Sequence, residues 1–312
     1  MALAVANSTR DIYAAAMSSF QAFCSHDMVL PLPLSESTLI RYCSAVANRL
    51  KYSSIKTYLA GIQFHSTIRG FQQHISGMRQ LYYVLRGIRR VQALNAGRPA
   101  KKPITFLHLA ILFDVVSVQY SRHDAAMLHS AMSLAFFGMM RVSEYTSSHA
   151  QTFAPEHTLL VEDVCLIDST LHISLKTSKT DPFRVGSVVR LVQTSCRFCP
   201  VLAFRTFSYF RGSRLGPLFM YENGSFLTRC KLSAMLQRFF PAANINTHSF
   251  RIGGASAASS AGIPDSSIRI LGRWSSDAFL RYLRYSDDDI AVFLSRMSQS
   301  DPRPVNGKFP LG

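Results

Sequence analysis

The sequence predicts a mainly α-helical protein with one small antiparallel β-sheet, an α+β arrangement spread over two domains. Its 312 residues exceed the size of one ordinary domain. Most segments repeat apolar residues at helical spacing, and only three neighbouring segments in the middle of the chain alternate as strands do. Hydrophobic residues make up 48% and charged residues 17% of the chain, which excludes a disordered or fibrous protein.

The first 95 residues are predicted to form four amphipathic helices. Ser35 precedes the second helix and is expected to cap it, because a serine hydroxyl there can accept from backbone N–H groups of the first turn. In the fourth helix, Leu81, Leu85 and Ile88 recur at helical spacing, whereas arginines gather elsewhere around the helix. A solvated charged face is the ordinary explanation of such a pattern.

A short basic segment with two prolines, residues 96–104, follows these helices. Proline restricts the backbone, so this segment is predicted to be an extended connector rather than part of a core. We therefore predict a helical domain over residues 1–95, a basic linker over 96–104 and a second domain over 105–312.

The second domain is predicted to begin with two helices, the first capped by Thr105 and the second running into Arg141. Residues 158–168, 170–178 and 185–193 then alternate as short antiparallel strands. Helices resume at 200–212 and 227–240, and short helices follow from residue 249. The order of helices, sheet and helices is typical of an α+β domain.

The chain is strongly basic, with 34 Lys and Arg against 18 Asp and Glu and a formal net charge of +16. Residues 1–106 hold 13 basic and 3 acidic residues, so their net charge is +10. Such an excess indicates a polyanionic partner, most often a nucleic acid. The predicted DNA-binding residues are Lys51, Lys56, Arg86, Arg89, Arg90, Arg98, Lys101 and Lys102.

Membrane and secreted proteins are not favoured. The most apolar run, Ala125 to Met140, is interrupted by His129 and is shorter than the roughly 20 apolar residues that cross a bilayer. The first ten residues lack the basic start and apolar stretch of a secretory signal, so we expect a protein that is not secreted. The six scattered cysteines are typical of reduced thiols.

One stretch near the end of the chain could carry chemistry. His248 and Arg251 are three residues apart, so they share a helix face near its N-terminus, where an anion is favoured. By itself this pair is a weak signal. It is followed by Leu271-Gly272-Arg273-Trp274 and then by Tyr282.

This order of residues resembles the tyrosine recombinase (phage integrase) family, and most of all the recombinases of eukaryotic mobile elements. The family's upstream Arg-x-Ser-Glu box is matched by FFGMMRVSEYT, which supplies Arg141 and Glu144. Its hairpin lysine is matched by Lys179, with Lys176 as a weaker candidate. The four N-terminal helices resemble the family's core-binding domain, and the second domain resembles its catalytic domain.

The resemblance implies a DNA strand transferase that works through a covalent 3′-phosphotyrosine, without metal, cofactor or ATP. It implies double-stranded DNA as partner, a homo-tetramer on DNA and a Holliday junction. In a eukaryotic host the protein is then expected in the nucleus, and otherwise in the cytoplasm. The implied catalytic residues are Arg141, Lys179, His248, Arg251, Trp274 and Tyr282, with Glu144 orienting an arginine.

Some alternatives stay open at this point. Tyr282 lies eight residues after Trp274, one fewer than is usual in the family, and Tyr285 is the other candidate nucleophile. Cys196 and Cys199 could form half of a zinc site, but no second pair of matching ligands follows. A recombinase-derived protein that binds DNA without cutting it, or an enzyme like type IB topoisomerases that nicks and reseals DNA, are the alternative functions.

Overall fold

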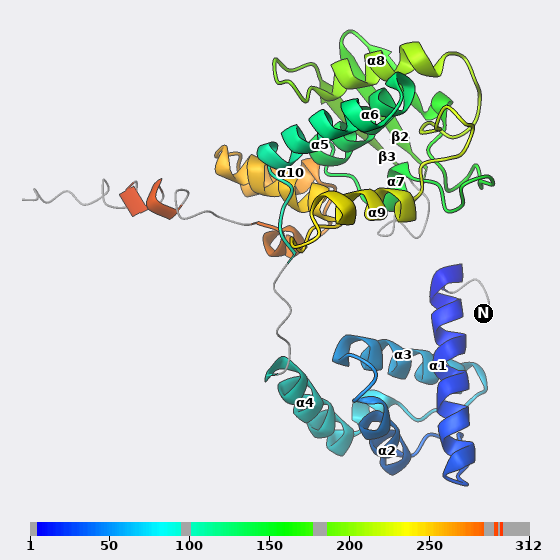
Figure 1. Ribbon diagram of the computed structural model, residues 1–312. Helices are drawn as coiled ribbons and strands as arrows, with labels where there is room; N and C mark the ends of the chain where they lie inside the picture. Colours follow the sequence, from blue (N-terminus) through cyan, green and yellow to red (C-terminus); the bar gives the residue numbers. More distant parts are fainter. Residues whose placement is uncertain (1–4, 95–100, 177–185, 284–289, 293, 296–312) are drawn as a thin grey trace, which may run out of the picture. The chain divides into compact units, whose positions relative to one another are not determined.

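The computed structural model describes residues 5–94, 101–176, 186–283, 290–292 and 294–295. The chain divides into two compact units, residues 1–99 and 100–312 (Figure 1). Helices dominate both units, and the described residues of the second unit include a three-stranded antiparallel sheet. The predicted combination of many helices and one small sheet is therefore confirmed.

The N-terminal unit is a small helical assembly around one apolar core. Phe20, Leu39, Ile55 and Ile62 are fully buried in that core. Gly61 allows α1 and α3 to approach closely, because a Cβ at this position would lie 2.9 Å from the Cα atom of Tyr13. The elements of this unit are α1 (Asn7–His26), α2 (Glu36–Val46), α3 (Tyr52–Ile68), η1 (Ile75–Gly77) and α4 (Arg79–Leu94).

Helix α4 packs on the rest of the N-terminal unit through one face only. Leu81 is its one fully buried residue, and its backbone N–H donates to Glu36 Oε1 at 3.0 Å. At the other end of the helix, Gln92 Nε2 donates to the carbonyl oxygens of Ala47 and Leu50 at 2.8 and 2.9 Å. These polar contacts hold one end of α4 against the start of α2 and the other against the turn between α2 and α3, and they leave its outer face in solvent.

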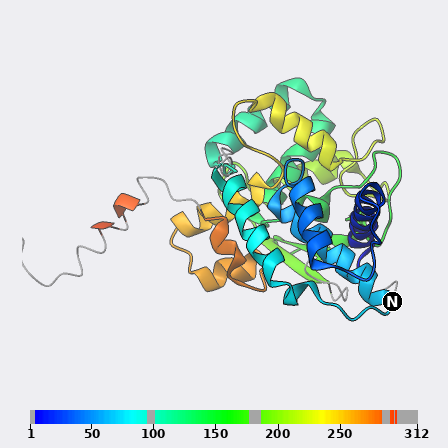
Figure 2. The same cartoon turned by 90° about the horizontal axis from the view of Figure 1, so that it is seen from below.

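The C-terminal unit is built around α6, which is buried along nearly its whole length. Helices α5, α8 and α10 pack against it, and α10 and α11 lie at one edge of the unit (Figures 1 and 2). The helices are α5 (Phe106–Gln119), α6 (Arg122–Phe137), α7 (Val142–Tyr145), η2 (Val161–Asp163), α8 (Pro200–Arg211), α9 (Arg229–Phe239), α10 (Ser249–Ser260), α11 (Asp265–Leu271) and η3 (Asp277–Arg281).

The sheet has the order β1-β2-β3, with both neighbouring pairs antiparallel. Leu171 and Ile173 on β2 point into the core, and their partners across β3 are Leu191 and Val189. The alternation of buried and exposed residues is the pattern that predicted strands here. The strands are β1 (Val164–Ile167), β2 (Thr170–Leu175) and β3 (Ser187–Val192).

The two predicted caps had different outcomes. The Thr105 hydroxyl accepts from the backbone N–H of His108, so the predicted cap of α5 is confirmed. Ser35 does lie just before α2, but its hydroxyl makes no capping bond and instead shares a 2.8 Å hydrogen bond with the Ser37 hydroxyl. The prediction of a Ser35 side-chain cap is wrong because a neighbouring hydroxyl competes for it. Within the described part of the chain, no helix is both long and apolar enough to span a membrane.

Two glycines bring α10 against the core. A Cβ at Gly253 would lie 2.0 Å from the carbonyl oxygen of Ile104, and one at Gly254 would lie 2.1 Å from that of Phe136. Backbone atoms cannot move aside cheaply, so only glycine fits at either place. The contact fixes α10 against the end of α6.

We predict that Gly254→Ala destabilises the C-terminal unit by about 2 kcal/mol or more, because overpacking outweighs the roughly 1 kcal/mol that alanine gains in a helix. Urea unfolding followed by the emission of Trp274 measures the loss. Ser260→Ala, at an exposed position of the same helix, is the matched control and should change little. Equal stability of the two variants would contradict the close packing.

Candidate active site

The turn between α6 and α7 presents Arg141. This residue is the N-cap of α7, and Glu144 lies three residues later. The Arg141 backbone N–H donates to Glu144 Oε2, and Arg141 Nη1 donates to Glu144 Oε1, each at 2.8 Å. The Glu144 side chain is 1% exposed and that of Arg141 is 17% exposed. The buried carboxylate thus holds a guanidinium group at the edge of solvent.

Helix α10 brings a second guanidinium group to the same turn. Arg251 is the third residue of α10 and is only 1% exposed. Its Nη1 donates to the carbonyl oxygen of Met139, and its Nη2 donates to that of Gly272 at 2.7 Å. Burial lowers the pKa of Arg251, and the nearby charge of Arg141 lowers it further. Two like charges gathered in a poorly solvated place favour a bound anion.

The indole of Trp274 covers Arg251. The Arg251 Cζ atom lies 4.2 Å from the centre of the Trp274 ring, which is a cation–π contact. The ring folds back over Gly272, where a Cβ would lie 1.7 Å from a ring atom. Arg251 is therefore closed off from solvent in this conformation.

Tyr282 completes the cluster. Its ring centre lies 5.7 Å from that of Trp274 and 5.0 Å from that of His248, which it meets edge to face at 69°. The Ser256 hydroxyl on α10 donates to the Tyr282 carbonyl oxygen at 3.1 Å. Apolar residues that include Ile268 and Phe279 pack beneath Trp274 and Tyr282. The end of η3 is thereby fixed against α10.

His248 occupies the position just before α10. Burial lowers its pKa to about 4, and the charges of Lys101, Arg251 and Arg141 act in the same direction. The imidazole is therefore neutral at physiological pH and has one ring nitrogen free to accept a proton.

The structure adds Arg273, a residue that the sequence analysis did not select. Arg273 Nη2 donates to Glu144 Oε2 at 2.9 Å, and its Nη1 donates to the Gly138 carbonyl oxygen at 3.0 Å. A signal was available, since Arg273 lies nine residues before Tyr282, whereas Trp274 lies eight before it. The family spacing of about nine fits the arginine better than the tryptophan.

Two residues that the sequence predicted for the site, the hairpin lysine Lys179 and the second candidate nucleophile Tyr285, lie outside the described residues. The weaker candidate Lys176 lines the same small cavity as Glu144. Its ammonium group is paired with Asp163 at 2.9 Å, so it already has an acidic partner.

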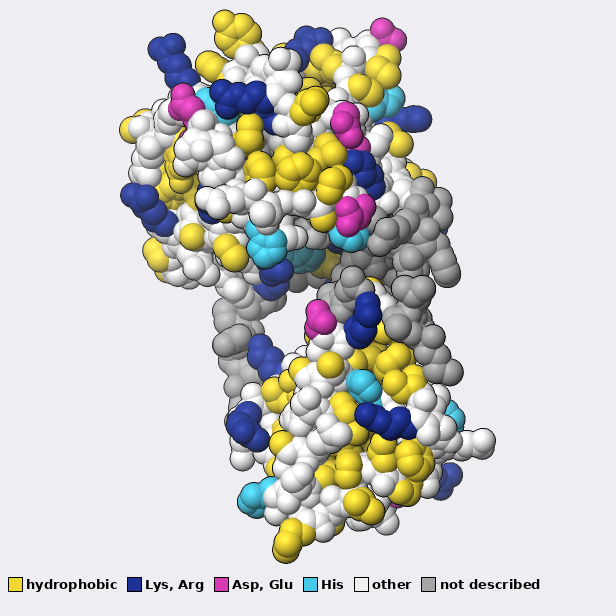
Figure 3. All heavy atoms as spheres, turned by 90° about the vertical axis from the view of Figure 1, so that its right-hand side faces the viewer, with side chains coloured by type: hydrophobic (Ala, Val, Ile, Leu, Met, Phe, Trp, Pro, Cys, Tyr) yellow, Lys and Arg dark blue, Asp and Glu magenta, His cyan; other side chains and the backbone are white. Residues whose placement is uncertain are grey.

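The predicted DNA-binding residues fall on exposed positions where they are described. Arg86, Arg89 and Arg90 lie on α4, and Lys51 and Lys56 lie at the start of α3. Two exposed tyrosines, Tyr82 and Tyr83, share α4 with the arginines. On the face of each unit that Figure 3 shows, Lys and Arg side chains outnumber Asp and Glu side chains.

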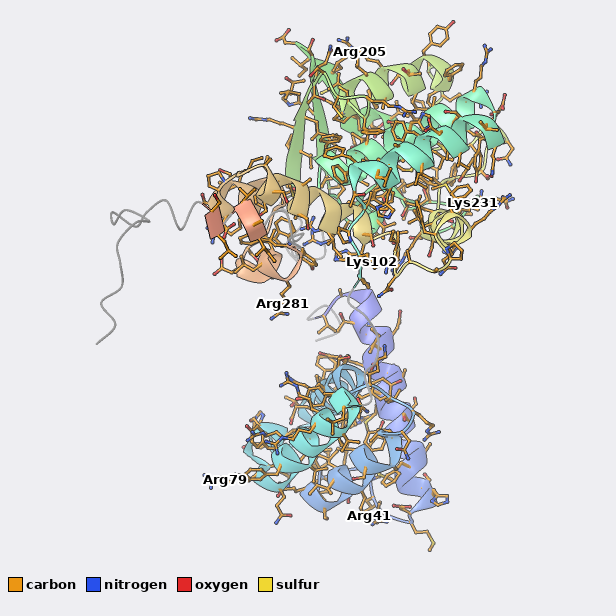
Figure 4. The ribbon with its side chains drawn as sticks, turned by 60° about the vertical axis from the view of Figure 1, so that its left-hand side comes forward. Arg41, Arg79, Lys102, Arg205, Lys231 and Arg281 are labelled. Atoms are coloured by element: carbon orange, nitrogen blue, oxygen red, sulfur yellow. The ribbon has the colours of Figure 1, made fainter. Side chains whose placement is uncertain are left out.

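The described part of the predicted linker continues into the C-terminal unit. The Lys102 backbone N–H donates to the Asn244 carbonyl oxygen at 3.0 Å, and Lys101 and Lys102 are both exposed. Figure 4 labels Lys102 where the chain enters this unit, with Arg205 at the opposite end. Arg98 lies outside the described residues.

No group of three or more His, Cys, Asp or Glu side chains is placed to hold a metal ion among the residues that the structure describes. Cys199 is buried just before α8, where its sulfur accepts from the Thr194 backbone N–H at 3.2 Å.

No protein-family model matches the sequence, and no curated protein matches it. Solved structures share its fold. The XerH site-specific recombinase bound to a palindromic difH substrate has a TM-score of 0.62 and 15% sequence identity, covering 92% of this chain and 79% of that chain. A lambda integrase dimer bound to a COC′ core site has a TM-score of 0.61 and 12% identity, with 90% of each chain covered.

The Tn1549 transposon integrase in complex with transposon right end DNA has a TM-score of 0.59 and 12% identity, covering 93% of this chain and 99% of that chain. The chain therefore has the fold of the tyrosine recombinases and integrases, as the sequence motifs predicted.

We predict that the His248 imidazole titrates near pH 4, well below the ordinary value of about 6.5. NMR titration of its ring carbons measures this directly. The unfolded chain binds a proton at His248 more readily than the folded chain does. Protonation of His248 therefore lowers the free energy of unfolding as the pH falls from about 6.5 to about 4. A midpoint near 6.5 in the folded protein would contradict the buried, arginine-rich environment.

Proposed function

We propose that this protein is a site-specific DNA recombinase or transposon integrase that cuts and rejoins DNA strands through a covalent 3′-phosphotyrosine, without metal or ATP. One observation carries the proposal: the turn after α6, the start of α10 and the segment after α11 together gather Arg141, His248, Arg251, Trp274 and Tyr282 in one cluster. The fold supports the same conclusion.

The two arginines suit a backbone phosphate. Phosphoryl transfer is catalysed mainly by positioning and by stabilising charge, and a guanidinium group offers a planar fork of donors to phosphate oxygens. Arg141 stands at the edge of solvent and is the first contact for the scissile phosphate in this proposal. Arg251 engages the phosphate only after the Trp274 ring has moved from above it. The displaced indole N–H then donates to a phosphate oxygen.

Tyr282 is the proposed nucleophile. Its oxygen attacks the phosphorus, the bond from phosphorus to the 5′-oxygen breaks, and a 3′-phosphotyrosine and a free 5′-hydroxyl result. His248 accepts the phenol proton, and the negative charge of the bound phosphate raises the pKa of His248 again. Lys179 is the proposed donor of a proton to the leaving 5′-oxygen. Attack by a 5′-hydroxyl of another strand reverses the step and exchanges strands.

The partners in this proposal are duplex DNA and further copies of the chain. The XerH and lambda integrase structures contain the DNA sites named above, and the latter is a dimer. By analogy with them, we propose that both units of this chain contact duplex DNA, with α4 and the basic residues near position 101 meeting phosphates. A homo-tetramer that passes through a Holliday junction is part of the proposal.

A second candidate is a recombinase-derived protein that binds DNA without cutting it. The observation that favours it is the complete cover over Arg251, whose Nη1 and Nη2 both donate to backbone carbonyl oxygens. The two functions differ in whether a covalent bond to DNA ever forms.

Covalent capture separates these functions without knowledge of the target site. We predict that the full chain, incubated in EDTA with nicked duplexes of randomised sequence, forms an adduct that survives denaturing gels. Tyr282→Phe should lower the adduct at least about 1,000-fold, since no other group supplies the bond. Sequencing the trapped DNA then gives the preferred duplex.

Arg205→Gln, which removes an exposed charge at the far end of the C-terminal unit, is the matched control and should still form the adduct. Loss of the adduct in Tyr285→Phe but not in Tyr282→Phe would move the nucleophile. DNA binding with no adduct from any duplex would favour the second candidate, and relaxation of supercoiled DNA without recombinant products would favour a topoisomerase-like enzyme.

A further inference from the structure

We propose that Arg273 is a positioning residue of the candidate active site. It acts through Glu144 to hold the guanidinium group of Arg141, and it fastens the segment that carries Trp274 to the turn after α6. The inference rests on the proposed function for its effect on catalysis, whereas the fastening can be tested in the free protein.

Glu144 is shared by two arginines. One carboxylate oxygen, Oε1, accepts from Arg141 Nη1, and the other, Oε2, accepts from both the Arg141 backbone N–H and Arg273 Nη2. A carboxylate that is 1% exposed keeps its orientation through these bonds. Without Arg273 it loses one of two charged partners and can rotate toward Arg141, which displaces the guanidinium group.

The same guanidinium group joins two turns that are distant in the sequence. Arg273 Nη1 donates to the carbonyl oxygen of Gly138, at the end of α6, and to that of Leu271, at the end of α11. Arg251 joins the same turns through the carbonyl oxygens of Met139 and Gly272. Arg251, which is buried, and Arg273, which is half-buried, therefore clamp the turn after α6 to the turn that leads into Trp274.

The backbone at Arg273 supports a specific role. Its φ angle is +56°, in the left-handed region that residues other than glycine seldom adopt. Such a conformation is unfavourable for an arginine and persists where surrounding contacts hold it. The Arg273 side chain is 15% exposed, and its hydrogen bonds to Gly138, Leu271 and Glu144 hold the backbone in this conformation.

A competing role is direct contact with the phosphate. Arg273 Nε is buried and has no partner among the residues that the structure describes, so it could donate to an anion. The two roles differ in their dependence on Glu144. A positioning residue loses its effect once Glu144 is neutral, whereas a residue that touches the phosphate keeps it.

A double-mutant cycle with Arg273→Gln, Glu144→Gln and the double variant separates these roles. The measurement is the single-turnover rate of adduct formation at saturating concentrations of the duplex recovered by covalent capture. Each single change should slow the reaction roughly 100-fold, as expected for a displaced reacting group. The double variant should be slowed about equally, not roughly 10,000-fold, while the affinity for DNA changes less than about threefold.

Two further variants, one at Arg273 and one at a distant arginine, test whether the effect is specific to the guanidinium group of Arg273. Arg273→Lys keeps the charge but lacks the planar fork, so it should stay at least about 10-fold slower than the unmodified protein; full activity of this variant would overturn the proposal. Arg205→Gln should react at the normal rate. Independent, multiplying effects of Arg273→Gln and Glu144→Gln would equally overturn it.

The fastening is tested without DNA. Trp274 is the only tryptophan, so acrylamide quenching of the free protein reports on this segment alone. Arg273→Gln should raise the quenching constant at least about twofold while Arg205→Gln leaves it unchanged. Unchanged quenching in Arg273→Gln refutes the fastening. A raised quenching constant in a protein that never forms an adduct refutes the proposed function but leaves the fastening intact.

Discussion

The candidate site depends on one buried carboxylate among three guanidinium groups. Glu144 accepts hydrogen bonds from Arg141 and Arg273, and Arg251 lies against the same turn through the Met139 carbonyl oxygen. These four described side chains, three arginines and one glutamate, together carry a net charge of +2. In a poorly solvated cluster such an excess is costly unless an anion joins it. The proposed phosphate supplies that anion, and the transition state for its transfer carries still more negative charge.

The rest of the C-terminal unit places these charges. The glycines of α10 let that helix approach the end of α6, so Arg251 reaches the turn that presents Arg141. The turn after α11 then brings Trp274 over Arg251 and leads into Tyr282. Apolar residues that include Ile268 and Phe279 pack against Trp274 and Tyr282 and hold both rings in place.

The sequence predicts the elements of this fold well because their patterns are local. Apolar spacing marks the helices, alternation marks β1 to β3, and Thr105 marks the start of α5. The prediction for Ser35 is wrong because another hydroxyl, two residues away, competes for the same bond. The motif spacing selects five candidate site residues, and the structure gathers them in one cluster: Arg141, His248, Arg251, Trp274 and Tyr282.

Contacts between distant residues could not be predicted in this way. The pairing of Arg273 with Glu144 spans 129 residues and depends on a left-handed backbone at Arg273. The cover of Trp274 over Arg251 depends on a ring folded back across Gly272. Neither follows from periodicity or from a motif, because each is set by how two turns meet in the folded chain.

The emission of Trp274, which covers Arg251, reports directly on whether the arginine cluster binds a phosphate. Its emission should change saturably when inorganic phosphate replaces chloride at constant ionic strength. The change should persist in Arg205→Gln and vanish in Arg141→Gln. Emission that is the same in phosphate and in chloride, or an equal response in Arg141→Gln, would show that these arginines do not bind the phosphate.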